Sequence, residues 1–121
     1  MAAADPPGAD TIKREIALEI ARVHVESYGE RVLNLSVAID HEMIAVMMDV
    51  EYSAAERTLL GADRADAVRA AREAYQEAIA SVFVAIVERA TGRRVIGFAS
   101  RMVIAEPTPW SVEIFRLQPS A

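Results

Sequence analysis

A long amphipathic segment, residues 63–92, lies between two pairs of short apolar segments, and this order constrains the fold more than any other feature of the chain. Its apolar side chains recur at three- and four-residue spacing, which is typical of a helix that buries one face. The flanking segments are rich in β-branched residues, as strands are. The pattern therefore predicts a two-layer α+β domain in which the long helix covers a sheet.

The first helix is predicted over residues 11–28, where Ile12, Ile16, Ile20 and Val23 form one apolar stripe. Asp10 or Thr11 can cap its first turn, because a short polar side chain accepts a hydrogen bond from a free backbone amide there. Gly29 can end the helix, since glycine adopts the left-handed conformation that closes many helices.

Four segments have the composition of strands, and each pair is close enough in sequence to form a hairpin. In the first, apolar and polar side chains alternate as they do in a half-buried strand. Its buried face is expected to carry Leu33, Leu35, Val37 and Ile39. The four predicted strands are residues 32–39, 43–50, 95–104 and 110–117, the last two joined by a proline-rich turn at residues 106–109.

Two further helices are bounded by recognisable caps. Ser53 and Glu56 have the spacing of a capping box, in which each side chain accepts a hydrogen bond from the other residue's backbone amide. Gly61 is expected to end this short helix, and Asp63 to cap the next one. Gly92 is expected to close the long helix in the left-handed conformation, so that a strand can begin soon after it.

The long helix is predicted to turn one broad stripe toward the sheet. That stripe contains Val68, Arg72, Tyr75, Ile79, Val82, Ile86 and Ala90, and it is widened by Phe83 and Val87. Arg72 is the outlier, because a charge on an apolar stripe must either reach water or find a partner. An internal ion pair is favoured over an interaction site for this residue.

The predicted fold class is therefore a two-layer α+β domain of order α-β-β-α-α-β-β. A four-stranded, mainly antiparallel sheet made of two hairpins packs against one long helix and one or two shorter ones. We expect the strand order 2-1-3-4 within the sheet. Residues 10–118 form the single domain, and residues 1–9, which contain Pro6, Pro7 and Gly8, are predicted to be a disordered tail.

Composition excludes several classes of protein. A chain of 121 residues with 53% hydrophobic residues suits one packed domain, and its net charge of −5 opposes nucleic-acid binding. The absence of cysteine excludes disulfides and thiolate chemistry and agrees with a reducing, cytoplasmic compartment. The longest uncharged apolar stretch, residues 78–87, is about half the ~20 residues of a membrane span, so no span is expected.

No motif in the sequence predicts catalysis, a metal or a cofactor. The two histidines lack a partner at metal-ligand spacing, the glutamates near the first hairpin sit at strand ends or in a cap, and the serines lie in no nucleophile motif. These residues are His24, His41, Glu42, Glu51, Glu56, Ser53, Ser81 and Ser100.

Arginine is the remaining candidate for recognition, because its planar guanidinium group suits anions and the carboxylates of a partner. The arginines considered are Arg69, Arg72, Arg93, Arg94, Arg101 and Arg116. Most are expected to be solvated or paired with the glutamates of the chain. Arg72, Arg93 and Arg94 are singled out as possible interaction or anion-binding residues.

From Leu33 to Leu117 the chain resembles the MpsC family, which is described as part of a sodium-translocating, membrane-potential-generating system. The resemblance rests on a distributed set of motifs, with Tyr-Ser at the helix entry where family members have a Leu-Thr-like pair. Those motifs are Tyr52-Ser53-Ala-Ala-Glu56-Arg-Thr-Leu59, Arg72 with Gln76, Glu88-Arg-Ala-Thr91-Gly92-Arg93-Arg-Val95, and Phe115-Arg-Leu117.

The resemblance implies a bacterial, cytoplasmic and non-enzymatic accessory or regulatory domain whose partner is a membrane transporter subunit. The alternative is a small anion- or ligand-binding domain, or an enzyme, that uses arginines and carboxylates at the rim of the sheet. A homodimer is also expected, because the second hairpin carries Trp110, Ile114 and Phe115, more apolar surface than a domain of this size covers by itself.

Overall fold

The computed structural model of the chain describes residues 5, 6 and 8–119 and confirms the predicted α+β class and element order. Part of the predicted tail, residues 1–4 and 7, lies outside the described residues. Each element begins and ends within two residues of its predicted bounds. The elements are α1 (Ala9–Ser27), β1 (Val32–Ile39), β2 (Met43–Val50), α2 (Ala54–Gly61), α3 (Ala65–Thr91), β3 (Val95–Val103) and β4 (Trp110–Leu117).

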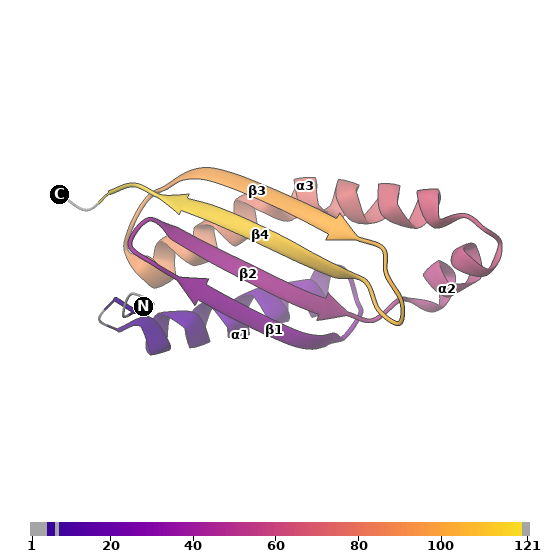
Figure 1. Ribbon diagram of the computed structural model, residues 1–121, viewed down its shortest axis with the longest axis horizontal. Coiled ribbons are helices and arrows are strands. Elements are labelled where there is room, and N and C mark those ends of the chain that lie inside the picture. Colours follow the sequence, from indigo (N-terminus) through magenta and orange to yellow (C-terminus); the bar gives the residue numbers. More distant parts are fainter. Residues whose placement is uncertain (1–4, 7, 120–121) are drawn as a thin grey trace.

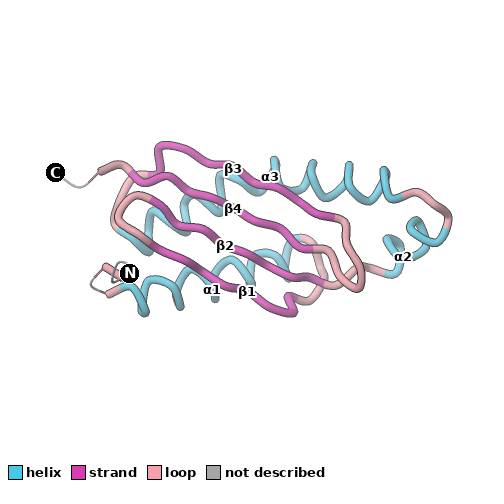
Figure 2. The backbone as a smooth tube through the Cα atoms, in the orientation of Figure 1, coloured by secondary structure: helices cyan, strands magenta, loops and turns pink. Residues whose placement is uncertain are grey.

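The sheet is antiparallel throughout, and its order is β1-β2-β4-β3 (Figures 1 and 2). The predicted order 2-1-3-4 is wrong, because β2 pairs with β4 and the two hairpins meet at these strands. Burial distinguishes the strands. The inner strands β2 and β4 each carry four buried residues, whereas β3 carries one and β1 none, as expected of edge strands whose side chains stay in contact with water.

Of the described helices, α1 and α3 lie behind the sheet in the view of Figure 1, and none covers its front face. Helix α1 packs behind the β1 side and α3 behind the β3 side, while α2 lies beyond one end of the sheet. The main core lies between these layers. It contains Ile16 and Ile20 of α1, Ile44, Val46, Met48 and Val50 of β2, Phe83, Ile86 and Val87 of α3, and Phe115 and Leu117 of β4.

A register shift at the start of β1 changes which of its side chains reach the core. Val32 pairs with Val50 but Asn34 pairs with Asp49, so the first strand contains one extra residue at this point. Val32 packs against the core as a result, and Leu33, which was expected there, has 43% of its surface exposed. From Leu35 onward the predicted alternation of buried and exposed side chains is confirmed, with Leu35, Val37 and Ile39 packed against the core.

The buried face of α3 is also rotated relative to the prediction. Val82, which was expected on the buried stripe, is 41% exposed, and Gln76, which was not, is buried. Phe83 is buried as predicted. The helix is 27 residues long, and its buried side is followed by Arg72, Gln76 and Phe83, which are four and then seven residues apart, as one face of a helix with 3.6 residues per turn requires.

Two of the predicted side-chain caps are absent. Helix α1 begins after Gly8, which is left-handed, and neither Asp10 nor Thr11 caps it. Helix α3 begins after Arg64 without a side-chain cap, and Asp63 instead takes a positive φ of 59° in the α2–α3 turn. Aspartate tolerates this conformation better than most residues, so a turn residue was mistaken for a cap.

Candidate functional site

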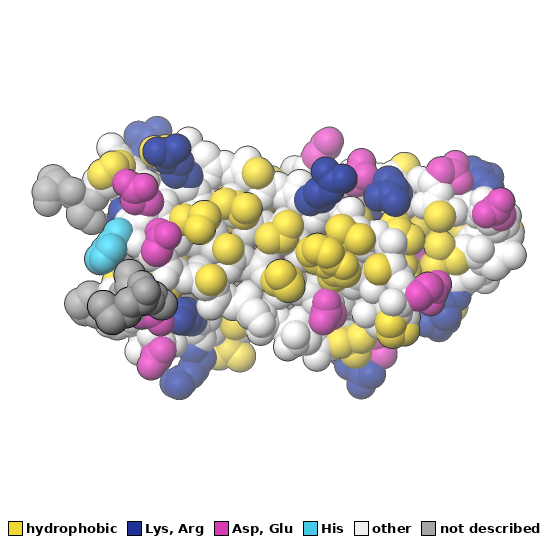
Figure 3. Space-filling model, viewed as in Figure 1, with side chains coloured by type: hydrophobic (Ala, Val, Ile, Leu, Met, Phe, Trp, Pro, Cys, Tyr) yellow, Lys and Arg dark blue, Asp and Glu magenta, His cyan; other side chains and the backbone are white. Residues whose placement is uncertain are grey.

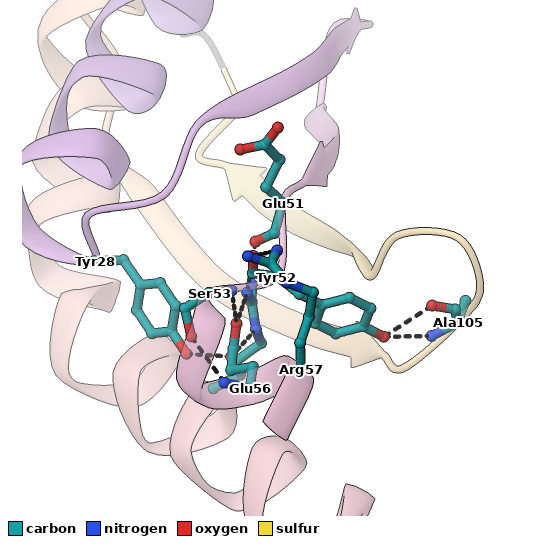
Figure 4. A network of polar contacts seen from close by, with 8 residues as sticks. Tyr28, Glu51, Tyr52, Ser53, Glu56, Arg57 and Ala105 are labelled. Atoms are coloured by element: carbon teal, nitrogen blue, oxygen red, sulfur yellow. Dashed lines mark hydrogen bonds and ion pairs between the residues drawn. The ribbon is translucent and has the colours of Figure 1, made fainter. Parts of the chain in front are cut away.

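The polar centre of the molecule begins at the capping box of α2. The Ser53 hydroxyl accepts a hydrogen bond from the Glu56 amide at 3.0 Å, and Glu56 Oε1 accepts one from the Ser53 amide at 2.9 Å (Figure 4). The reciprocal pair predicted from the sequence is therefore present. It fixes Glu56, whose side chain is turned into the molecule and is 7% exposed.

Ser53→Ala should lower the free energy of unfolding by about 1 kcal/mol, because the Glu56 amide at the start of α2 loses its acceptor. Chemical denaturation measures the change. Ser100→Ala, at an exposed position of β3, is the matched control and should change stability by less than about 0.5 kcal/mol. Equal stability of the Ser53 variant and the parent would contradict the capping role.

The carboxylate of Glu56 meets Arg72 of α3, and the two form a buried salt bridge. Arg72 Nε donates to Glu56 Oε2 at 2.6 Å, and Arg72 Nη2 donates to Glu56 Oε1. Arg72 Nη2 also donates to the backbone carbonyl of Glu51, at 3.0 Å. The arginine side chain is 3% exposed. The internal ion pair favoured for Arg72 is thus the arrangement found, and it joins α3 to both the α2 entry and the end of β2.

Two tyrosines enclose this ion pair. The Arg72 guanidinium lies 4.7 Å from the ring centroid of Tyr28 and 5.8 Å from that of Tyr52, within the range of cation–π attraction. Tyr28 also donates to Glu56 Oε2 at 2.7 Å, and Tyr52 donates to the Ala105 carbonyl at 2.8 Å in the β3–β4 loop (Figure 4). One network therefore ties together α1, β2, α2, α3 and the second hairpin.

The ion pair determines the charge state of Glu56. Burial by itself raises the pKa of this carboxyl group, but the hydrogen bonds from Arg72, the Ser53 amide and Tyr28 outweigh burial and leave the pKa below its usual value. Glu56 is therefore an anion at neutral pH. Its negative charge is neutralised within the domain.

A second polar cluster lies next to the ion pair, around a small internal cavity of about 20 Å³. Its polar side chains are the buried His24 of α1, Gln76 of α3, and Ser111 and Glu113 of β4, and Arg72 lines its other side. Ser111 donates to Glu113 Oε1 at 3.1 Å. The volume is enough for about one water molecule, so the cluster has no space for an organic substrate.

Several polar atoms of this cluster have no hydrogen-bond partner among the described residues: both ring nitrogens of His24 and Oε2 of Glu113. The imidazole is instead enclosed by rings, stacked on Tyr28 with centroids 5.5 Å apart and edge-on to Tyr75 at 5.8 Å. Such groups are costly to bury as ions. Protonation of Glu113 and neutrality of His24 both reduce that cost.

The pKa values follow from this burial. Desolvation raises the pKa of the Glu113 carboxyl from 4.5 to about 7, against the opposing effects of Ser111 and Gln76. Desolvation lowers the pKa of His24 from 6.5 to about 4, and the positive Arg72 acts in the same direction while Glu56 opposes it. Inside the domain, the cluster can therefore take up or release one proton near neutral pH.

Sequence reasoning missed Glu113 and assigned no role to His24 in this cluster. A signal for Glu113 was available, since Ser111 and Glu113 alternate with Val112 and Ile114 and share the face of Phe115. Placing these two polar residues on the core side required knowing that the helices cover that face. His24 follows Ile16 and Ile20 at four-residue spacing, which already placed it on the buried stripe of α1.

Residues 9–116 match the family described as the Na+-translocating membrane potential-generating system (MpsC). The chain belongs to the MpsC family. No curated protein and no solved structure gives a significant match. The MpsC name links the chain to a sodium-translocating membrane system, and none of the described helices combines the length and apolar character needed to span a membrane.

Within the matched MpsC region, the Glu88–Val95 motif closes α3 and starts β3. Glu88 accepts a hydrogen bond from the Val95 amide at 3.0 Å, and the Thr91 hydroxyl donates to the Val87 carbonyl at 2.7 Å. Gly92 takes the left-handed conformation expected of it, with φ 68°. This motif, one of those that carry the resemblance to MpsC, thus has a structural role, which is to join the long helix to an edge strand.

The two arginines after this motif differ in surroundings. The Arg93 side chain is half-buried and donates to the Gln118 carbonyl at 2.8 Å, which attaches the segment after β4 to the end of α3. Arg94 is exposed. The structure therefore does not bring Arg72, Arg93 and Arg94 into one site, since Arg72 lies toward the other end of α3.

The remaining sequence candidates are dispersed. His41 and Glu42 lie exposed in the β1–β2 turn, Ser81 and Ser100 are exposed, and the Glu51 carboxylate forms a salt bridge with Arg31 at 2.7 Å. In the part of the chain that the structure describes, no three histidine or acidic side chains gather in a way that could hold a metal ion.

Proposed function

We propose that this MpsC protein is a non-enzymatic accessory or regulatory domain that acts in the cytoplasm with a membrane subunit of a Na+-translocating, potential-generating system. The family match over residues 9–116 carries the proposal, because it includes every described helix and strand except Leu117, the last residue of β4. The family's name supplies the membrane system, and the accessory role is our inference.

The side chains that could take part in chemistry are buried and engaged with other parts of the same chain, which supports a non-enzymatic role. Arg72 and Glu56 neutralise one another, and both are held by further hydrogen bonds from within the chain. Glu113 and His24 face a cavity of about 20 Å³ and are at most 3% exposed. Groups arranged in this way stabilise the domain and can respond to protons, but they do not present a reactive atom to a substrate in solution.

The alternative function, recognition of a small anion, has one candidate location. An open groove runs between α3 and β3 and contains Arg69 and Arg101. Glu73 and Glu77 line the same groove, so its charges are balanced. An anion there would meet as many carboxylates as guanidinium groups, which makes this reading weaker than the accessory role.

The two functions are distinguished by a pair of measurements. Cells that lack the protein should show a smaller membrane potential in sodium buffer than the parent cells, and about the same potential when potassium replaces sodium. The purified protein should melt at the same temperature with or without millimolar bicarbonate, phosphate or acetate, since a ligand that binds the folded state raises the melting temperature by mass action.

The opposite pattern would contradict the accessory role. An unchanged sodium-dependent potential in the deleted strain removes its main support. A rise in melting temperature with one of the anions, abolished by Arg101→Ala, would instead assign the groove between α3 and β3 as an anion site. Arg94→Ala is the matched control for that substitution, because Arg94 is exposed near the opposite end of β3.

A further inference from the structure

The face of the sheet opposite the helices is apolar across its centre (Figure 3). Met47 is 52% exposed, and Ile114 is 39% exposed on the neighbouring strand. Phe115, which was expected to contribute to this surface, is fully buried on the helix side. We call the remaining surface the open face, and its apolar part is formed by Ala38, Met43, Ala45, Met47, Ala99, Val103, Trp110, Val112 and Ile114. The exposed Arg101 of the edge strand β3 lies on the same side of the sheet, in the row of Val112.

The open face contains both a projection and a hollow. The projection is the exposed side chain of Met47 near the middle of β2. Beside it the small side chains of Ser36, Ala38 and Ala45 leave a shallow hollow, which Met47 and Val112 border. A surface that carries matching convex and concave features close together can pair with its own copy, because a two-fold axis then fills each hollow with the other copy's projection.

The register of the sheet shows which axis achieves this match. Met47 lies in the row of Val112, and the next row contains Ala45 and Ile114. A two-fold axis that runs across the strands between these rows places Met47 of one copy over Ala45 of the other. Met47 of each copy then packs on Ala45 of the other, so the dimer contains this contact twice.

The same axis brings opposite charges together at the two ends of the open face. Asp49 pairs with Trp110 at one end of the β2–β4 ladder, and Met43 pairs with Arg116 at the other. Rotation about the axis places the Asp49 end of one copy over the Arg116 end of the second. Each Asp49 thus lies opposite Met43 of the second copy, one strand to the side of Arg116, and Trp110 lies opposite Arg116 itself, so the long guanidinium side chain can reach both.

We propose that the open face is the interface of a homodimer, in which the sheets of two copies pack face to face about a two-fold axis perpendicular to the strands. Packed sheets lie about 10 Å apart, and side chains such as Met47 and Ile114 fill the space between them. This assembly does not depend on the proposed role in the membrane system. It leaves the helical layer of both copies accessible.

Analytical ultracentrifugation at high micromolar concentration tests the interface. The parent protein should sediment with twice the monomer mass, and Met47→Asp should sediment as a monomer, because the dimer would bury two unpaired carboxylates. Leu18→Asp is the matched control: Leu18 is 64% exposed on α1, away from the open face, so this variant should remain a dimer. Circular dichroism melts of both variants establish that they are folded.

A charge exchange tests the orientation of the two copies. Asp49→Arg and Arg116→Asp should each weaken association about tenfold, because each places like charges opposite one another, and the double variant should restore it. A dimer that tolerates both single changes, or a double variant no tighter than either single one, would overturn the proposed axis. A monomeric parent protein, or a dimeric Met47→Asp variant, would overturn the interface itself.

Discussion

Glu113→Gln is expected to stabilise the protein relative to the parent at alkaline pH and to have little effect in acid. The carboxyl group has a pKa of about 7 in the folded protein, compared with 4.5 for the free side chain, because it is desolvated between the sheet and the helices. Glutamine has a similar shape and can still accept a hydrogen bond from Ser111, but it never acquires a charge.

The direction of the effect follows from proton binding. Between pH 4.5 and about 7 the folded state retains a proton that the unfolded state has released, so folding becomes less favourable as the pH rises. The stability that protonated Glu113 contributes is complete below pH 4.5 and is lost as the pH rises through about 7. Integrated over this window, the parent loses about 3 kcal/mol that the glutamine variant keeps.

Urea denaturation of both proteins over a pH series measures the difference. The stability of Glu113→Gln minus that of the parent should increase by about 3 kcal/mol between about pH 4 and pH 8. Glu77→Gln, on the exposed side of α3, is the matched control and should show a flat difference. Parallel pH profiles for the parent and Glu113→Gln would show that Glu113 is ionised in the folded protein at neutral pH.

His24 contributes to stability with the opposite pH dependence. Its pKa is about 4 in the folded protein and 6.5 in the free side chain, so the unfolded state binds the extra proton and stability falls as the pH decreases through this range. The effects of His24 and Glu113 on stability therefore offset one another over the pH range in which both groups differ in protonation between the folded and unfolded states. The parent protein should accordingly show a broad stability plateau in mild acid, and the contribution of either residue is measured as the difference between the parent and a variant that lacks it.

Local sequence signals predicted much of the fold because they concern neighbours along the chain. The capping box at Ser53 and Glu56 and the left-handed Gly92 are formed within one helical turn, so spacing alone identifies them. The strand order required a comparison of non-adjacent segments. Both orders satisfy the alternating patterns of the strands, and only the joint burial of β2 and β4 distinguishes them.

The candidate site was harder to predict because its residues come from distant parts of the chain. Arg72 stood out as a charge on an apolar stripe, but its partner Glu56 already had a complete explanation as a capping residue. A capping glutamate can also form an ion pair, because its two oxygens accept several hydrogen bonds at once. Glu113 escaped notice because a glutamate in an alternating strand is usually assigned to the solvent side.

Arg72→Met is expected to lower the free energy of unfolding by about 3–5 kcal/mol, the usual cost of removing one partner from a buried ion pair. An apolar replacement would be tolerated if the remaining carboxylate could reach water. Glu56 cannot, since its side chain is 7% exposed and is held by the Ser53 amide and Tyr28. The uncompensated anion, more than the lost contact, therefore determines the cost.

The double variant Arg72→Met with Glu56→Gln should recover most of that loss. Glutamine still accepts from the Ser53 amide, as capping boxes allow, and it removes the buried charge that methionine leaves unpaired. Arg69→Met, on the exposed side of the same helix, controls for the change of residue type.

Thermal and chemical denaturation of the parent, the two single variants and the double variant decide the question. If Arg72→Met were as stable as the parent, the ion pair would contribute nothing to folding. A double variant less stable than Arg72→Met would show that Glu56 acts mainly through hydrogen bonds that require its charge.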